Sequence, residues 1–138
     1  MFVDDSAIVR GFMRRWIEDD HRIELVKACS ESGEVIVEVG RHHPDVIVLG
    51  GGNTAMDCCR SARRLGGEEV KVVVRSGFDE MKASPWEKED AQHEGIPIIN
   101  CHVPLAFLHQ GGRLTGMRFQ VVQPVFDEKG RRRLVPTG

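Results

Sequence analysis

Apolar residues in the first hundred positions alternate between short continuous runs and longer segments whose apolar positions are three or four apart. The continuous runs predict β-strands, at residues 1–3, 23–26, 46–49, 70–74 and 96–101. The spaced segments predict helices, after a Ser6 cap and at residues 34–39, 54–65 and 85–94. Repeated alternation of strand and helix favours an α/β protein with a doubly wound parallel sheet and right-handed crossovers.

The helix that follows Ser6 has the clearest apolar stripe in the chain. Its apolar residues recur at helical spacing, namely Ile8, Phe12, Met13, Trp16 and Ile17. Charged residues such as Arg14 and Arg15 fill the positions between them. We therefore expect an amphipathic helix whose stripe faces the core.

The last third of the chain has a different pattern. Strand-like segments at residues 105–108, 114–122 and 133–135 are separated by turn signals at 110–112 and 127–130. This predicts a C-terminal antiparallel hairpin or meander. The basic triplet at 131–133 is read as a solvated strand entrance rather than a nucleic-acid patch.

The strongest chemical signal is the segment 46–55, which carries a GxGxxA pattern between a buried strand and a helix. Gly50 would supply permissive backbone angles, Gly52 would let the backbone approach a pyrophosphate, and small Ala55 would let helix and strand pack closely. Amides at the start of the helix would receive the phosphates. The candidate binding residues are Gly50, Gly51, Gly52, Asn53, Thr54 and Ala55. The alternative is a glycine turn that only tightens the crossover.

The residues after the predicted strand at 70–74 indicate which dinucleotide would bind. An acidic residue there would bind the ribose hydroxyls of NAD, whereas this chain has Arg75 and Ser76. Arg75 can make a charge-assisted bidentate contact to a 2′-phosphate, and Ser76 can add a hydroxyl donor. NADPH is therefore favoured over NAD, with an ordinary exposed strand-end charge as the alternative for Arg75.

Composition and charge exclude several classes of protein function. The chain has 138 residues and a formal net charge of −2, which fits one α/β domain and excludes a broadly basic nucleic-acid surface. It has no apolar run of about 18 residues and no secretory-signal pattern. We expect a cytoplasmic protein without membrane contact. The four cysteines lack CxxC spacing and are expected to be reduced thiols, and no catalytic residue is predicted.

Several segments from residue 46 onward carry a family resemblance. They lie at 46–60 (VIVLGGGNTAMDCCR), 72–75, 81–87 (MKASPWE), 111–117 (GGRLTGM) and 130–137 (GRRRLVPT). Residues 46–138 resemble the NADPH-binding domain of FAD-dependent oxidoreductases of the glutamate synthase small-subunit type. The resemblance implies NADPH bound on Gly50, Gly52, Asn53 and Thr54, with Arg75 at its 2′-phosphate. Many relatives carry a second arginine where Ser76 stands. In that family the domain is an insertion within the FAD domain. No FAD-binding segment is recognised in this chain, so we expect that it does not bind FAD.

Residues 1–49 instead resemble the first half of a response-regulator receiver of the chemotaxis methylesterase type. The matching segments are 3–7, 9–11, 15–18 and 44–49. In a receiver the acidic pair, here Asp4 and Asp5, helps to hold Mg²⁺, and a phospho-accepting aspartate would follow Leu49. Gly50 stands there, so no aspartyl phosphate can form at that place. A helix-entry anion pair is the alternative for Asp4 and Asp5.

The two resemblances meet within one strand, which suggests a chimera that is recombinant, designed or artefactually joined. Receiver topology followed by a crossover predicts a flavodoxin-like, Rossmann-like strand order 2-1-3-4-5. Ligands bind such sheets between strands 1 and 3. Asp4 and Asp5 would therefore lie beside the glycine loop, where they would oppose a pyrophosphate unless Mg²⁺ bridged the charges.

The leading hypothesis is a dinucleotide-binding module that prefers NADPH and does not turn over alone, because the flavin that would accept hydride is missing. One alternative is a degenerate receiver that acts by binding protein partners. The other is a structural chimera with no retained ligand.

Overall fold

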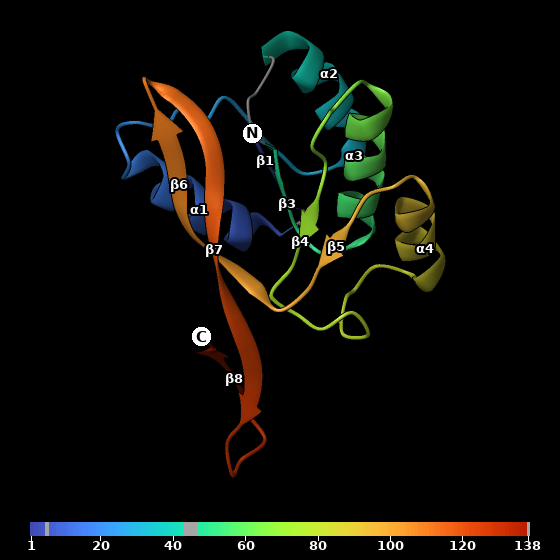
Figure 1. Ribbon diagram of the computed structural model, residues 1–138, viewed down its shortest axis with the longest axis vertical. Coiled ribbons are helices and arrows are strands. Elements are labelled where there is room, and N and C mark those ends of the chain that lie inside the picture. Colours follow the sequence, from blue (N-terminus) through green and yellow to red (C-terminus); the bar gives the residue numbers. More distant parts are fainter. Residues whose placement is uncertain (5, 43–46, 138) are drawn as a thin grey trace.

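A computed structural model describes residues 1–4, 6–42 and 47–137 and shows a mixed α/β chain (Figure 1). The helices are α1 (Ala7–Glu18), α2 (Ser32–His42), α3 (Asn53–Arg64) and α4 (Pro85–His93). The short strands are β1 (Phe2–Val3), β2 (Ala28–Cys29), β3 (Val48–Leu49), β4 (Val72–Val73) and β5 (Ile98–Ile99). The longer strands are β6 (His102–Gln110), β7 (Arg113–Phe126) and β8 (Arg132–Pro136). The α/β class is thus confirmed, and no helix of the described segments is long and apolar enough to cross a membrane.

The parallel strands form two small sheets rather than the single sheet predicted. One sheet has the order β2-β1-β3 and the other pairs β4 with β5, all in parallel. The predicted continuous order 2-1-3-4-5 is therefore not formed in the described residues. The chain leaves β3 at Gly50, and the next glycine, Gly51, packs against the Val74 side chain. The ends of β3 and β4 thus meet through a side chain and not through a hydrogen-bonded ladder.

The position of the second strand was also predicted wrongly. Residues 23–27 are irregular, and the strand forms later, at Ala28–Cys29. Ile23 donates its amide to the carbonyl of Asp20, in a turn that follows α1. Phe2 and Val3 pair with Ala28 and Cys29, so the long-range register decides where this two-residue strand lies.

The apolar stripe of α1 is mostly uncovered, contrary to prediction. Ile17 is buried, but Ile8 and Phe12 are 73% and 69% exposed. A twelve-residue helix is about 18 Å long, whereas a two-residue strand spans only about 7 Å, so the β2-β1-β3 sheet cannot cover the stripe. The Ser6 cap is confirmed, because its hydroxyl accepts the amide of Val9 at 3.4 Å.

Two separate clusters of buried residues flank α3. One lies among α3, α4, β4 and β5 and contains Ala55, Met56, Cys59, Val72, Val74, Met81, Ala83, Ala91 and Ile96. The other lies toward β1, β2 and α2 and contains Met1, Val3, Cys29, Val35 and Cys58. Helix α3 contributes residues to both clusters, so it is the element that joins the two parallel sheets.

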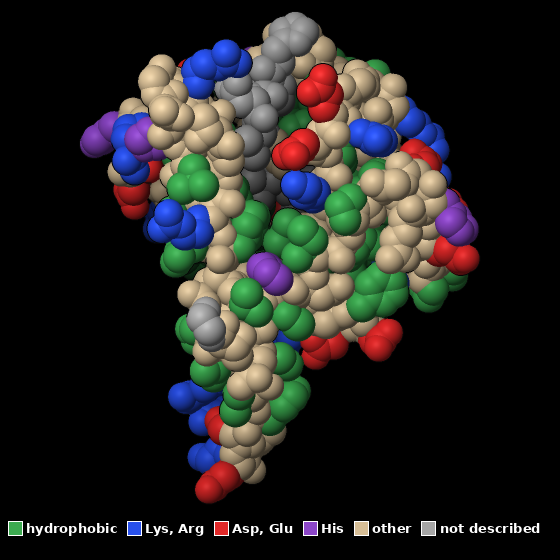
Figure 2. Space-filling view, in the orientation of Figure 1, with side chains coloured by type: hydrophobic (Ala, Val, Ile, Leu, Met, Phe, Trp, Pro, Cys, Tyr) green, Lys and Arg blue, Asp and Glu red, His purple; other side chains and the backbone are tan. Residues whose placement is uncertain are grey.

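The C-terminal strands form the antiparallel meander that the turn signals predicted. The order is β6-β7-β8, and the part of β7 that pairs with β8 extends away from the body as an arm (Figure 1). Gly111, Gly112 and Gly130 have positive φ angles at the two turns. Charged side chains cluster at the free end of this arm (Figure 2). Within the basic triplet, Arg131 pairs with Asp127 at 2.8 Å and Arg132 with Glu80 at 2.9 Å.

Candidate functional site

The glycine loop connects β3 to the N-terminus of α3. Gly50 donates its amide to the carbonyl of Val3 at 3.1 Å, which attaches the loop to β1. Gly51 accepts the amide of Ala83 at 3.3 Å, which attaches it to the segment before α4. Gly52 is the N-cap residue of α3, and no side chain caps this helix. The α3 N-terminus therefore presents a positive dipole end without a side-chain acceptor.

The expected reason for a glycine at position 50, a permissive backbone conformation, does not hold in the structure. None of the three loop glycines has a positive φ, so permissive backbone angles are not the reason for glycine here. A Cβ on Gly50 would overlap Oδ2 of Asp4, and a Cβ on Gly51 would lie 3.1 Å from Cγ1 of Val74. A Cβ on Gly52 would meet open space within 4 Å. Close packing thus explains the first two glycines, and Gly52 leaves room beside the helix N-terminus.

Asp4 lies directly against the glycine loop, as predicted for the end of the first strand. Its Oδ2 is in contact distance of Gly50, and its Oδ1 accepts the amide of Ser6 at 2.8 Å. Asp5, the second predicted Mg²⁺ ligand, lies outside the described residues. The described residues contain no group of three or more His, Cys, Asp or Glu side chains able to hold a metal ion. Geometry thus gives no support to Mg²⁺ at this place.

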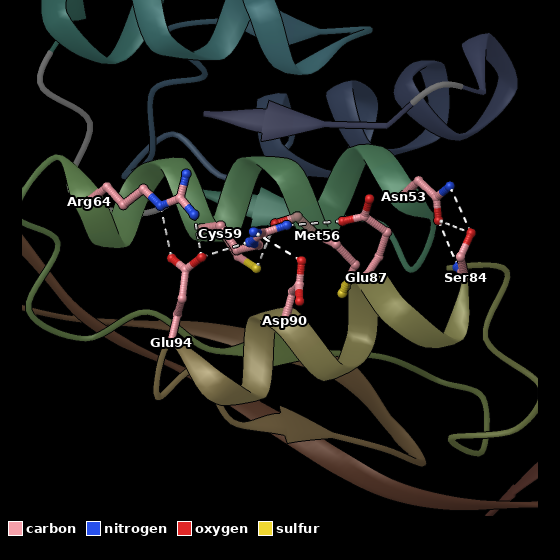
Figure 3. Close-up of polar contacts among 9 residues, drawn as sticks. Asn53, Met56, Cys59, Arg64, Ser84, Glu87, Asp90 and Glu94 are labelled. Atoms are coloured by element: carbon pink, nitrogen blue, oxygen red, sulfur yellow. Dashed lines mark hydrogen bonds and ion pairs between the residues drawn. The ribbon is translucent and has the colours of Figure 1, made fainter.

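A second helix N-terminus lies beside that of α3. The Asn53 Oδ1 accepts the Ser84 amide at 2.7 Å, and its Nδ2 donates to the Ser84 hydroxyl at 3.2 Å (Figure 3). Ser84 is the N-cap of α4, so α3 and α4 begin at the same end of the molecule. Both positive dipole ends are therefore near the glycine loop. Asn53 was predicted as a cofactor-binding residue, and its side chain is hydrogen-bonded to Ser84, which holds the two helices together.

Arg75 and Ser76 follow β4 on the side of the loop. Val74, the residue before Arg75, contacts Gly51, which brings the end of β4 to the glycine loop. Arg75 is exposed and has no hydrogen bond or ion pair within the described residues. The Ser76 carbonyl accepts the Cys101 amide at 3.2 Å and the Asn100 Nδ2 at 3.1 Å. Ser76 is therefore held in place, and the guanidinium of Arg75 is available to a ligand.

Thr54 and Ala55, two of the predicted cofactor-binding residues, lie in the first turn of α3. Ala55 is 3% exposed and belongs to the cluster with Val72 and Val74, as expected for a small residue between helix and strand. Thr54 is half-buried. The first turn of α3 is thus fixed against β4, while its amide end faces the loop.

An ion-pair network links α3 to α4 and was not predicted from the sequence. Arg60 pairs with Glu87 and Asp90 at 3.2 Å each and with Glu94 at 2.9 Å (Figure 3). Arg64 also pairs with Glu94. The signal was present as Arg60 and Arg64 four residues apart on one helix and three acidic residues spaced by three and four on the next. This network fixes the alignment of the helices whose N-termini flank the loop.

The cysteines of α3 are placed as small apolar residues. All four cysteines of the chain are free, and Cys29, Cys58 and Cys59 are buried. Burial raises the pKa of Cys58 to about 12 and that of Cys59 to about 11. Burial also raises the pKa of Cys29. These thiols are therefore protonated near neutral pH and are poor nucleophiles.

Thiol labelling is expected to separate Cys101 from the other three. With iodoacetamide at pH 8, Cys101 should react first because it is only partly buried, and Cys29, Cys58 and Cys59 should react only after unfolding. Mass spectrometry of peptides from native and denatured protein measures the order. Native labelling of Cys58 or Cys59 as fast as that of Cys101 would contradict the placement of α3.

Part of this chain is similar in sequence to known oxidoreductase subunits. No protein-family model matches the chain. The chain is 43% identical over 94 residues to the NADP(+)-dependent formate dehydrogenase subunit beta of Moorella thermoacetica, which covers 66% of this chain and 13% of that protein. It is 39% identical over 95 residues to the NADPH-Fe(3+) oxidoreductase subunit beta of Geobacter sulfurreducens, covering 66% of this chain and 14% of that protein.

This chain is similar to a segment of oxidoreductase subunits. A third relative, YgfK of Escherichia coli O157:H7, is 42% identical over 102 residues, which is 73% of this chain and 9% of YgfK. The chain thus spans less than a sixth of the length of these curated relatives. The similarity therefore concerns one module and not the whole of any of these proteins.

Proposed function

We propose that the chain is an NADPH-binding module. The observation that carries the proposal is the α3 N-terminus, which follows the glycine loop, has no side-chain cap and has open space at Gly52. Free amides at a helix N-terminus, together with the dipole, are a ready anion site for a pyrophosphate. The names of two relatives, NADP(+)-dependent and NADPH-Fe(3+) oxidoreductase subunits, agree with this ligand class.

Arg75 is proposed to give the preference for NADPH over NADH. It is exposed and unpaired among the described residues, and it follows Val74, which contacts Gly51. A guanidinium can bind the 2′-phosphate through two parallel hydrogen bonds. Ser76 is expected to add a hydroxyl donor to the same phosphate.

The bound dinucleotide would supply hydride chemistry, and this chain would hold and orient it. We propose that the hydride acceptor is a flavin of a separate domain or subunit, that the chain itself does not bind FAD, and that it does not turn over alone. Two relatives are named as beta subunits. That naming favours a protein partner for this module as well.

Calorimetric titration tests the proposal. NADPH should bind the protein saturably and more tightly than NADH. Replacing Arg75 with alanine should weaken NADPH binding by about tenfold or more, because a charge-assisted contact is worth about 1.5–3 kcal/mol, while NADH binding should be little changed. Arg113→Ala, at the exposed β6–β7 turn, is the matched control. Absence of NADPH binding by folded protein, in wild type and in every variant, would refute the proposal.

A further inference from the structure

A residue that lies against the glycine loop carries a charge of the wrong sign for a phosphate ligand. Asp4 follows β1 and places Oδ2 where a side chain of Gly50 would begin. The Asp4 carboxylate therefore occupies the space that the missing side chain of Gly50 leaves open. A carboxylate there lies at the edge to which the dinucleotide phosphates would come.

The Asp4 carboxylate is held in this position. Its Oδ1 accepts the Ser6 amide at 2.8 Å, just before α1 begins. The Asp4 backbone is fixed as well, since its amide donates to Cys29 at 3.2 Å and its carbonyl accepts Nη1 of Arg10 at 2.7 Å. Moving the carboxylate away from the loop would break the bond to Ser6, so the charge remains beside Gly50.

We propose that Asp4 is an internal competitor of the dinucleotide pyrophosphate and sets the affinity of this site. The proposal rests on the proposed function. Like charges a few ångströms apart repel more strongly in a half-buried site than in water, because the local dielectric is lower. A ligand must therefore bind against the Asp4 charge, and its affinity depends on how many phosphate charges approach Gly50. Asp4 thus acts as a specificity determinant against the pyrophosphate, whereas Arg75 acts in favour of the 2′-phosphate.

Two ligands and two variants separate these effects. NADPH carries both the pyrophosphate and the 2′-phosphate, whereas adenosine 2′-monophosphate carries only the latter. Asp4→Asn keeps an oxygen that can accept the Ser6 amide and removes the charge. Asp19→Asn makes the same charge change at the far end of α1, where Asp19 is the C-cap residue. Calorimetry gives the dissociation constants, and thermal melts show that each variant is folded.

Asp4→Asn is expected to tighten NADPH binding by about tenfold and to leave the affinity for adenosine 2′-monophosphate unchanged. Asp19→Asn should change neither affinity. NADPH binding that appears only in Asp4→Asn would also support the inference. Equal NADPH affinities in wild type and Asp4→Asn would overturn it and leave the NADPH module intact. Failure of every form to bind NADPH would overturn both proposals.

If Asp4→Asn does not fold, the salt dependence of the wild-type protein still tests the inference. Salt screens both interactions. Screening the repulsion between Asp4 and the pyrophosphate raises the affinity, whereas screening the attraction between Arg75 and the 2′-phosphate lowers it. The loss of affinity between 50 and 500 mM NaCl should therefore be smaller for NADPH than for adenosine 2′-monophosphate. A larger loss for NADPH would overturn the role of Asp4.

Discussion

Replacing Met56 with alanine is expected to lower the free energy of unfolding by about 3 kcal/mol. Met56 is 0% exposed and lies in the cluster formed by α3, α4, β4 and β5. Its truncation removes buried apolar surface and leaves a cavity beside Val72 and Ile96, where backbone elements on several sides limit collapse. Urea denaturation followed by circular dichroism measures the change.

Leu65→Ala is the matched control for Met56→Ala. Leu65 caps the other end of the same helix and is 59% exposed, so its truncation should cost less than about 0.5 kcal/mol. A cost below 1 kcal/mol for Met56→Ala would show that α3 does not pack against β4 as described. Because α3 contributes to both clusters, the transition should also remain single and cooperative.

Replacing Arg60 with alanine is expected to destabilise the protein by about 2 kcal/mol. The Arg60 side chain is 20% exposed and pairs with carboxylates at 87, 90 and 94 on α4. Its removal leaves these acidic groups near one another without their shared cation, which costs more than the loss of one surface pair. Arg64→Ala is the control, because Arg64 is 63% exposed and pairs only with Glu94, so a few tenths of a kcal/mol are expected. Equal effects of the two substitutions would contradict a central role for Arg60.

The Arg60 network also predicts the direction of a pH effect. Hydrogen bonds from Arg64 and Arg60 lower the pKa of Glu94 from its ordinary value of 4.5. A lowered folded-state pKa means that the stabilisation is fully present above about pH 4.5 and is lost as the pH falls further. The difference in stability between wild type and Arg60→Ala should therefore shrink below that pH. Denaturation midpoints measured between pH 7 and pH 3 check this, and a constant difference would contradict it.

Helix positions could be predicted from the sequence because they depend on local spacing. The predicted helices at 54–65 and 85–94 correspond to Asn53–Arg64 and Pro85–His93, and Gly95 has a positive φ just after the latter. The C-terminal meander was predicted from turn glycines for the same reason. In contrast, the strand expected at 23–26 forms at Ala28–Cys29, because pairing with Phe2 and Val3 places it.

The receiver-like reading of residues 1–49 and the origin of the chain as a chimera remain predictions. The order β2-β1-β3 and the position of Asp4 beside Gly50 are compatible with them. Cys58 of α3 lies in the same buried cluster as Val3 and Cys29, so α3 packs against residues of both halves.

The sequence by itself determined the helices, the glycine loop between strand and helix, and Arg75 after the next strand, because each depends on neighbours within a few residues. Only the tertiary structure decided what surrounds them. It left Ile8 and Phe12 of α1 exposed, split the parallel strands into two sheets, and joined Arg60 to the carboxylates of Glu87, Asp90 and Glu94. Each of these contacts links positions far apart along the chain. Local periodicity carries no information on such distances, so these contacts could be settled only in three dimensions, whereas the position of Asp4 beside the loop already followed from the expected order of the first three strands.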